Sequence, residues 1–294
     1  MERTQEIRRE RTASWLAPSV RVSVDQTVVA AAELARRNQV LEAQLTALRS
    51  DHDELRRVLL DAAQAQRRLC GPRHLHRGDF EVAGEIFPVR HLSGDFICAM
   101  EQGPDLVLAI GDIAGKGLDA GMWFNQVVSI IRRRAASEWD PAAAVAAVNR
   151  DFCQTPIAVP MTTLFLARLD LAAGVLSYCN AGHPPALLLR SDGNSELLHE
   201  GGPVLGALKE VEYSSGQAVL QKGDVVLAYS DGIAECRNEA GEEFGGDRVS
   251  AALAASAGSS AISRLFSVLG AVEDFAGVHQ REDDIALLVV EREM

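Results

Sequence analysis

Hydrophobic residues recur every seven positions between Thr27 and Leu69. A leucine or an alanine stands at positions 34, 41, 48, 55, 62 and 69. This spacing places the six residues along one face of a helix, as the d positions of a coiled coil. The matching a positions are Asn38, Leu45, His52, Leu59 and Gln66. Because a buried Asn at an a position sets register and strand number, the pattern favours a dimeric coiled coil.

The ends of this pattern predict the domain boundaries. Gly71 and Pro72 end the helix, since proline lacks a backbone N–H and glycine terminates helices. We therefore expect an N-terminal tail over residues 1–26, a coiled-coil dimerisation and regulatory helix over 27–72, and a second domain over 73–294. The alternative is that the helix packs on its own domain or on a different partner.

Beyond residue 73, short apolar runs and alternating patterns replace the heptads. Asp140 before Pro141 predicts a helix start, and further helices are expected over 118–136 and 259–278. Strands are predicted at 80–87, 96–100, 106–110, 162–170, 175–180, 186–190, 196–199, 216–220, 225–229 and 285–291. This order predicts an α+β fold in which two antiparallel sheets stack and helices cover both outer faces.

Composition narrows the class of protein further. The 294 residues are 47% hydrophobic and carry a formal charge of −12, which disfavours nucleic acid as a partner. No run of about 18 apolar residues and no signal-peptide pattern occurs, so we expect no membrane insertion and a cytoplasmic location. The five cysteines are scattered and show no C-x-x-C spacing, which we interpret as unpaired thiols without structural zinc.

Aspartates stand at the ends of several apolar runs. Asp112 follows the run 106–110, Asp231 follows 225–229, and Asp283 and Asp284 precede 285–290. Asp95, in Ser-Gly-Asp, precedes another predicted strand. A carboxylate that loses water beside a buried strand needs a cation or a donor to stay ionised. Oxygen ligands suit Mg²⁺ or Mn²⁺, so we expect these carboxylates to converge on a hard-metal site.

Five segments carry a resemblance to a known family. They are Ser-Gly-Asp at 93–95, Gly-Asp-Ile-Ala-Gly-Lys-Gly at 111–117, Asn-Ala-Gly-His-Pro-Pro at 180–185, Tyr-Ser-Asp-Gly-Ile-Ala-Glu at 229–235 and Asp-Asp-Ile at 283–285. In this order, from about Phe80 to the C-terminus, the chain resembles the SpoIIE/RsbU-type serine phosphatases. These form the bacterial branch of the metal-dependent PPM superfamily, which is similar to protein phosphatase 2C.

The resemblance implies an α/β/β/α sandwich and a site with two Mn²⁺ or Mg²⁺ ions. By this resemblance Asp95 and Asp112 lie closest to the bridging position, Asp231 and Asp283 complete the second ion, and the Ile113 carbonyl adds an oxygen. Asp284 is a rival to Asp283 as ligand. Two divalent ions about 4 Å apart can share a water, lower its pKa and direct the resulting hydroxide at phosphorus.

Two further residues are candidates for substrate binding. Arg90 is a candidate phosphate clamp, because guanidinium binds phosphate oxygens bidentately; the alternative is an ordinary surface arginine. His183 is a candidate proton donor to the leaving serine oxygen. A histidine followed by two prolines is at least as readily explained as a structural residue.

Together these features predict a metal-dependent phosphoserine/phosphothreonine protein phosphatase. The resemblance suggests a phosphorylated bacterial regulator as substrate, an anti-sigma-factor antagonist of the STAS type, with a separate sensor or activator protein acting through the N-terminal helix. One alternative is a non-catalytic scaffold that retains the fold. Ala114 and Ala286 keep this alternative open, because the family usually has Ser and Thr at these two positions. Another is a hydrolase of small phosphate esters.

Overall fold

A computed structural model describes residues 18–71, 73–89, 91–115, 117–279 and 281–294, with side chains from residue 26 onward. The chain separates into a first unit that ends at Val58 and a second unit over Leu59–Met294. Within the described residues, no helix is both long enough and apolar enough to span a bilayer.

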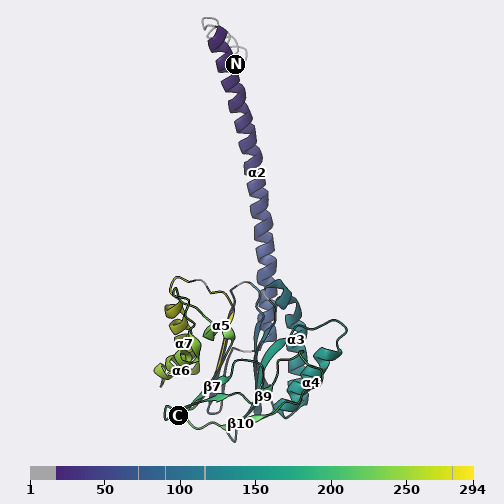
Figure 1. The fold of residues 1–294 in the computed structure, drawn as a ribbon, viewed down its shortest axis with the longest axis vertical. Coiled ribbons are helices and arrows are strands. Elements are labelled where there is room, and N and C mark those ends of the chain that lie inside the picture. The colour runs from purple at the N-terminus through teal and green to yellow at the C-terminus, as the bar shows by residue number, and fades with distance from the viewer. Residues whose placement is uncertain (1–17, 72, 90, 116, 280) are drawn as a thin grey trace. The chain divides into compact units, whose positions relative to one another are not determined.

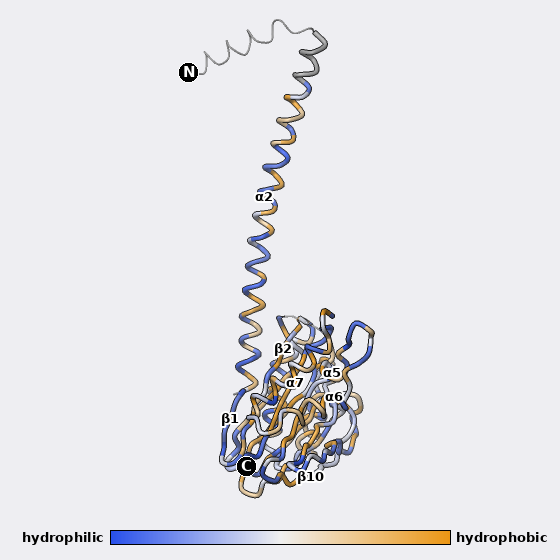
Figure 2. The backbone as a smooth tube through the Cα atoms, turned by 90° about the vertical axis from the view of Figure 1, so that its left-hand side faces the viewer, coloured by the Kyte–Doolittle hydropathy of each residue, from blue (hydrophilic) through white to orange (hydrophobic). Residues whose placement is uncertain are grey.

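Helix α2 (Pro18–Leu69) contains the heptad segment and begins at Pro18 instead of Thr27. Residues 18–26 are therefore helical and not part of a tail, while 1–17 lie outside the described residues. Valines at every second position from 20 to 24 obscured the helical period in the sequence. Figure 2 shows hydrophobic and hydrophilic positions following one another along α2. Its leucines at 34, 41, 48 and 55 are 49–67% exposed.

The last turns of the same helix belong to the second unit. Gln66 is only 7% exposed, and its side-chain amide donates to the Ser93 carbonyl at 3.5 Å. Leu69 packs against a buried cluster, and its carbonyl accepts a hydrogen bond from Arg132. The end of the heptad pattern therefore packs on the chain's own domain.

Two mostly antiparallel sheets form the centre of the second unit. The first has the order β1-β2-β12-β11-β7-β8, and the second has the order β10-β6-β5-β4-β3, with β9 parallel to β6. The first sheet contains β1 (His74–Arg77), β2 (Phe80–Phe87), β7 (Ala186–Leu189), β8 (Ser195–Leu198), β11 (Val225–Tyr229) and β12 (Ile285–Arg292). The second contains β3 (Asp95–Gln102), β4 (Asp105–Ile113), β5 (Thr162–Asp170), β6 (Val175–Ala181), β9 (Gly201–Gly202) and β10 (Gly216–Val219).

Helices cover both outer faces, as Figure 1 shows, and confirm the predicted α/β/β/α sandwich. One face carries α3 (Leu118–Ser137) and α4 (Pro141–Gln154), and the other carries α6 (Gly245–Ala255) and α7 (Ala261–Ala276). The Asp140 side chain caps α4 as predicted, by accepting from the Ala143 N–H at 3.0 Å. Helix α6, strands β1 and β9 and the short helix α5 (Asp231–Ala234) were not predicted from the sequence.

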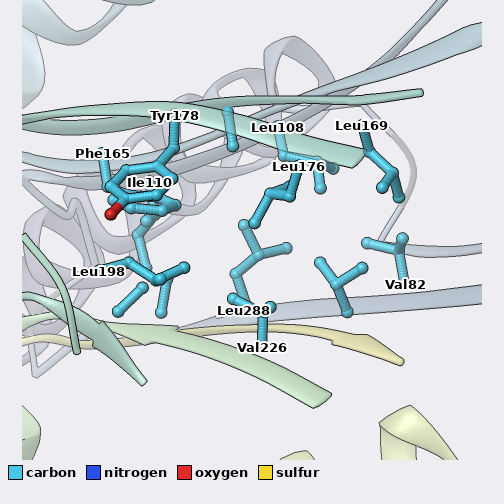
Figure 3. Packing of buried hydrophobic residues seen from close by; sticks show 14 of the residues in the cluster. Val82, Leu108, Ile110, Phe165, Leu169, Leu176, Tyr178, Leu198, Val226 and Leu288 are labelled. Carbon is cyan, nitrogen blue, oxygen red and sulfur yellow. The ribbon is translucent and has the colours of Figure 1, made fainter. Parts of the chain in front are cut away.

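The core between the sheets consists of aliphatic and aromatic side chains from both inner faces (Figure 3). Val82, Val226 and Leu288 come from the first sheet and meet Leu108 and Phe165 of the second. Burial of each such side chain contributes about 1.5–3 kcal/mol. This rigid double layer holds the loops at the strand ends, where the candidate site lies.

Candidate metal-dependent active site

Asp95 and Asp112 lie opposite each other on neighbouring strands. Asp95 is the first residue of β3, and the antiparallel register pairs it with Asp112 near the end of β4. Asp95 is 2% exposed. A Cβ at Gly94 would come within 2.7 Å of Asp112 Oδ1 and 2.8 Å of the Ile113 carbonyl oxygen. Only glycine therefore lets the Ser-Gly-Asp turn approach these two oxygens so closely.

The other three aspartates come from the facing sheet. Asp231 begins α5 just after β11, while Asp283 and Asp284 precede β12. Because β11 and β12 are antiparallel neighbours, the end of one lies beside the start of the other. Ser230 joins the two segments, since its N–H donates to the Ala286 carbonyl at 3.0 Å and its Oγ accepts from the Ala286 N–H at 2.8 Å.

Asp283 and Asp284 differ in their contacts. Asp284 Oδ1 accepts from the Val89 N–H at 2.8 Å, and Oδ2 accepts from the Gly94 N–H at 3.3 Å. Both oxygens of Asp284 thus hold the loop that leads to Asp95. Asp283 instead lines a hollow at the surface, and its Oδ1 accepts from the Asp284 N–H at 3.0 Å.

Geometry and charge both connect these carboxylates: Asp95 pairs with Asp112, Asp112 and Asp231 line one hollow, and Asp284 bonds to the Gly94 N–H. Burial, followed by repulsion from Asp112, Asp284 and Asp231, raises the pKa of Asp95 well above its usual value, and a hydrogen bond from Ser230 only partly offsets this. Burial and repulsion from Asp231, Asp283 and Asp284 raise the pKa of Asp112 to about 7. Among the described residues, neither Asp95 nor Asp112 forms an ion pair with a basic side chain.

These residues fit a hard divalent cation. Asp95 Oδ2 is buried and has no hydrogen-bond partner, which is a costly state for a carboxylate oxygen. The surrounding donors are carboxylate and carbonyl oxygens, the ligands that Mg²⁺ and Mn²⁺ prefer. In the described part of the chain, no three acidic, histidine or cysteine side chains are already positioned to hold an ion, so ion binding would require side-chain adjustment.

His183 is largely buried, and it lines a hollow together with Asp112 and Asp231. Its Nδ1 lies 2.9 Å from Thr163 Oγ1, which accepts from the Asp112 N–H at 3.1 Å. Asn180 holds the His183 backbone through two hydrogen bonds of 2.8 and 2.9 Å. Burial lowers the pKa of His183 to about 3, despite stabilisation from the Tyr229 backbone. The imidazole is therefore neutral near pH 7, and its role as a proton donor stays a prediction.

Ser230 and Thr163 were not predicted as site residues. Ser230 connects the segment before Asp231 to the start of β12, and Thr163 Oγ1 accepts from the Asp112 N–H. No signal in the sequence pointed to Thr163, because only the pairing of β5 with β4 places its hydroxyl opposite Asp112. Arg90, the predicted phosphate clamp, lies outside the described residues.

A different arginine, Arg281, lies two residues before Asp283. Its NH1 atom is buried without a hydrogen-bond partner. It lines a hollow of about 250 Å³ next to the carboxylates, together with Gly232, Glu235, Cys236, Arg237, His279, Glu282 and Asp283. No pattern in the sequence distinguished Arg281 from the many other arginines.

Comparison with known proteins identifies the family. Residues 102–293 match the family model "Stage II sporulation protein E (SpoIIE)", so the chain belongs to the SpoIIE family. It is 25% identical over 250 residues to phosphoserine phosphatase RsbU of Bacillus subtilis, an alignment that covers 84% of this chain and 73% of RsbU. These matches indicate a protein serine phosphatase.

Solved structures agree on the fold. The RsbU and RsbW domains of Rv1364c from Mycobacterium tuberculosis match with a TM-score of 0.62 and 26% identity, over 73% of this chain and 61% of that one. The SiaA-PP2C domain of Pseudomonas aeruginosa matches with a TM-score of 0.70 and 18% identity, over 82% of this chain and 98% of that one. RsbX, solved in complex with magnesium, matches with a TM-score of 0.55 and 14% identity, over 74% and 97%.

Proposed function

We propose that the chain is a Mn²⁺- or Mg²⁺-dependent phosphatase that removes phosphate from serine or threonine of a bacterial regulatory protein. The observation that carries this proposal is the convergence of Asp95, Asp112, Asp231 and Asp283 from two sheets around a buried carboxylate oxygen without a partner. The magnesium in the RsbX complex and the activity named for RsbU point in the same direction.

In this proposal the four aspartates and the Ile113 carbonyl would hold the cations. Divalent cations, when bound, supply Lewis-acid activation of water and of the phosphoryl group. Asp284 acts as a positioning residue, because both of its oxygens already accept backbone hydrogen bonds from Val89 and Gly94. This contact set favours Asp283 over Asp284 as the ligand.

The substrate proposed is a phosphorylated regulator of the STAS type, as the family resemblance suggests. The hollow beside Asp283 supports recognition of a protein segment, because Arg281 is one of the residues that line it. Arginine is well suited to bind carboxylates and phosphates. Arg281→Ala should raise KM for a phosphoprotein about tenfold and leave p-nitrophenyl phosphate hydrolysis unchanged. Arg133→Ala is the control, since Arg133 lies on α3 outside this hollow and is paired with Asp151 at 2.9 Å.

The decisive experiment measures phosphate release from a serine phosphopeptide with Mn²⁺, with Mg²⁺ and with EDTA. We expect release only with a divalent cation, and its loss in Asp231→Asn. Asp224→Asn is the control, because Asp224 precedes the same strand β11 at its opposite end. Equal rates in EDTA would contradict the proposal, and a preference for free phosphoserine over the phosphopeptide would indicate a small-ester hydrolase.

We further propose that α2 forms a homodimer through its heptads. The leucines at 34, 41, 48 and 55 present an apolar stripe that is at least 49% exposed in the single chain, and such a stripe is stable in water when a second helix covers it. Light scattering should give twice the 31.6 kDa chain mass, and Leu41→Lys with Leu48→Lys should reduce it to one chain. Arg36→Lys with Arg49→Lys serves as control. A monomeric parent chain would exclude self-pairing and favour a different partner.

A further inference from the structure

Two cysteines that are distant in sequence meet where α2 joins the sandwich. Cys70 directly follows the last residue of α2, and Cys98 lies in the middle of β3. The Ala99 N–H donates to the Cys70 carbonyl at 3.3 Å, so the two backbones run side by side. Both side chains belong to one buried cluster, with Cys98 inside it and Cys70 packed against it.

The backbone at this junction is closely packed. Gly71 has φ +85°, and a Cβ there would come within 2.6 Å of the Ala99 carbonyl oxygen. The hydrogen bond joins Cys70 to the residue after Cys98, so the two cysteines lie on adjacent stretches of backbone. A disulfide forms between cysteines whose Cα atoms are about 4.4–6.8 Å apart, and adjacent backbones can reach this separation.

The two thiols have different surroundings. Cys98 is 0% exposed and belongs to the cluster under α3, whereas Cys70 is half-buried at its edge. The Cys98 hydrogen bond and the nearby Arg132 and Arg73 lower the pKa of Cys70, while burial and the Cys70 contact raise that of Cys98. Cys70 is therefore the accessible, thiolate-forming partner, and Cys98 is the thiol placed to resolve it.

We propose that Cys70 and Cys98 are a site of reversible oxidation at which peroxide produces an intramolecular disulfide. The Cys70 thiolate attacks one peroxide oxygen, the O–O bond breaks, and the products are a Cys70 sulfenic acid and hydroxide. The Cys98 sulfur then attacks the sulfenic sulfur; the S–O bond breaks, and the leaving hydroxide takes the Cys98 proton and departs as water. Two sulfurs are oxidised and one peroxide is reduced, and a dithiol reductant reverses the change.

The other three cysteines lack this arrangement. Cys179 is buried, and burial raises the pKa of its thiol to about 12. Burial also raises the pKa of Cys236. Cys153 donates weakly to the Leu208 carbonyl at 3.8 Å. These thiols serve as internal references for the reactivity of Cys70. The bond would tie the end of α2 to β3, three residues from Asp95.

The test exposes the reduced full-length chain to equimolar hydrogen peroxide and counts thiols after denaturation. We expect a fall from five to three, recovery with dithiothreitol, and a peptide map that contains a Cys70–Cys98 bond within one chain. Cys70→Ser should keep its four remaining thiols, and Cys98→Ala should yield a Cys70 sulfenic acid that dimedone traps. Cys153→Ser and Cys236→Ser should still form the bond.

A second measurement uses the unmutated protein, so that it does not depend on the folding of a variant. Iodoacetamide should modify Cys70 about tenfold faster than Cys153 or Cys236 at pH 7. A thiol count that stays at five, a bond between two chains, oxidation of Cys70 without a bond, or slower alkylation of Cys70 than of Cys236 would each overturn the proposal.

Discussion

Three strands of the sandwich carry an acidic residue at each end, and the two ends differ in their partners. At the end away from the candidate site, each acid pairs with an arginine. The pairs are Asp105 with Arg168 at 3.4 Å at the start of β4, Asp224 with Arg190 at 2.8 Å just before β11, and Glu291 with Arg264 at 3.0 Å near the end of β12. These acids are 1–8% exposed.

At the site end the same strands carry Asp112, Asp231 and Asp284, which gather with Asp95 and Asp283. Asp95 is as buried as Asp105, yet its Oδ2 has no hydrogen-bond partner. Asp105 has its counter-charge within the fold, whereas the Asp95 carboxylate is buried beside Asp112 and repelled by it. Burial of an acid therefore does not by itself indicate a metal site.

The largest expected effect separates the two ends of β4. Asp112→Asn should lower the cation-dependent kcat for a phosphopeptide about 1000-fold, or about 4 kcal/mol in the barrier, because it removes a proposed ligand. Asp105→Asn should keep kcat within about threefold. Initial rates at saturating Mn²⁺ measure both, and an Asp112→Asn enzyme that retains a tenth of the activity would refute the assignment.

Much of this contrast was not available from the sequence. Hydrophobic runs predicted the strands and placed acids at their ends, and the prediction that Asp95, Asp112, Asp231 and Asp283 lie near one another agrees with their electrostatic coupling. Yet Asp105 and Asp224 flank the same runs as Asp112 and Asp231. Only the tertiary fold brings Arg168 to Asp105 and Arg190 to Asp224, because both arginines come from other strands or loops.

The same limit applies to α2 and α6. The heptads continue to Leu69 without a break, but Gln66 and Leu69 pack on the sandwich while Leu48 and Leu55 stay exposed. The local sequence does not distinguish these turns, because their difference in exposure arises from tertiary contacts with the sandwich. Helix α6 begins at Gly245-Gly246 and is rich in alanine, so neither its cap nor its hydrophobic period was evident.

The next largest effect tests a paired acid. Arg264→Met should lower the free energy of unfolding by about 3 kcal/mol, because it leaves the Glu291 carboxylate buried without its two hydrogen bonds from Arg264. Urea unfolding followed by circular dichroism measures this. Adding Glu291→Leu should restore much of the loss, since the unpaired charge is then gone. A single variant as stable as the parent would show that the pair contributes nothing.

A smaller effect concerns His183, which is buried without a charged partner near the site. Its pKa of about 3 in the folded chain lies below the ordinary 6.5, so the unfolded chain binds more protons between these values. Stability should therefore fall as pH decreases below 6.5, by up to about 1.4 kcal/mol per unit. Between pH 6 and 4.5, the free energy of unfolding of His183→Asn should fall by about 2 kcal/mol less than that of the parent. Parallel stability curves for the two proteins would contradict this.

The smallest effect has the opposite sign from that of Arg264→Met. Without metal, Asp95→Asn should raise the free energy of unfolding by about 1 kcal/mol at pH 8, because it removes a carboxylate that is buried beside Asp112. Asp105→Asn, at the paired end, should lower it. Adding Mn²⁺ at 100 times its dissociation constant should stabilise the parent by about 2.7 kcal/mol and Asp95→Asn much less. Destabilisation by Asp95→Asn in EDTA, to the same extent as Asp105→Asn, would mean that the two ends of the sandwich do not differ, and would remove the electrostatic argument for a cation at this site.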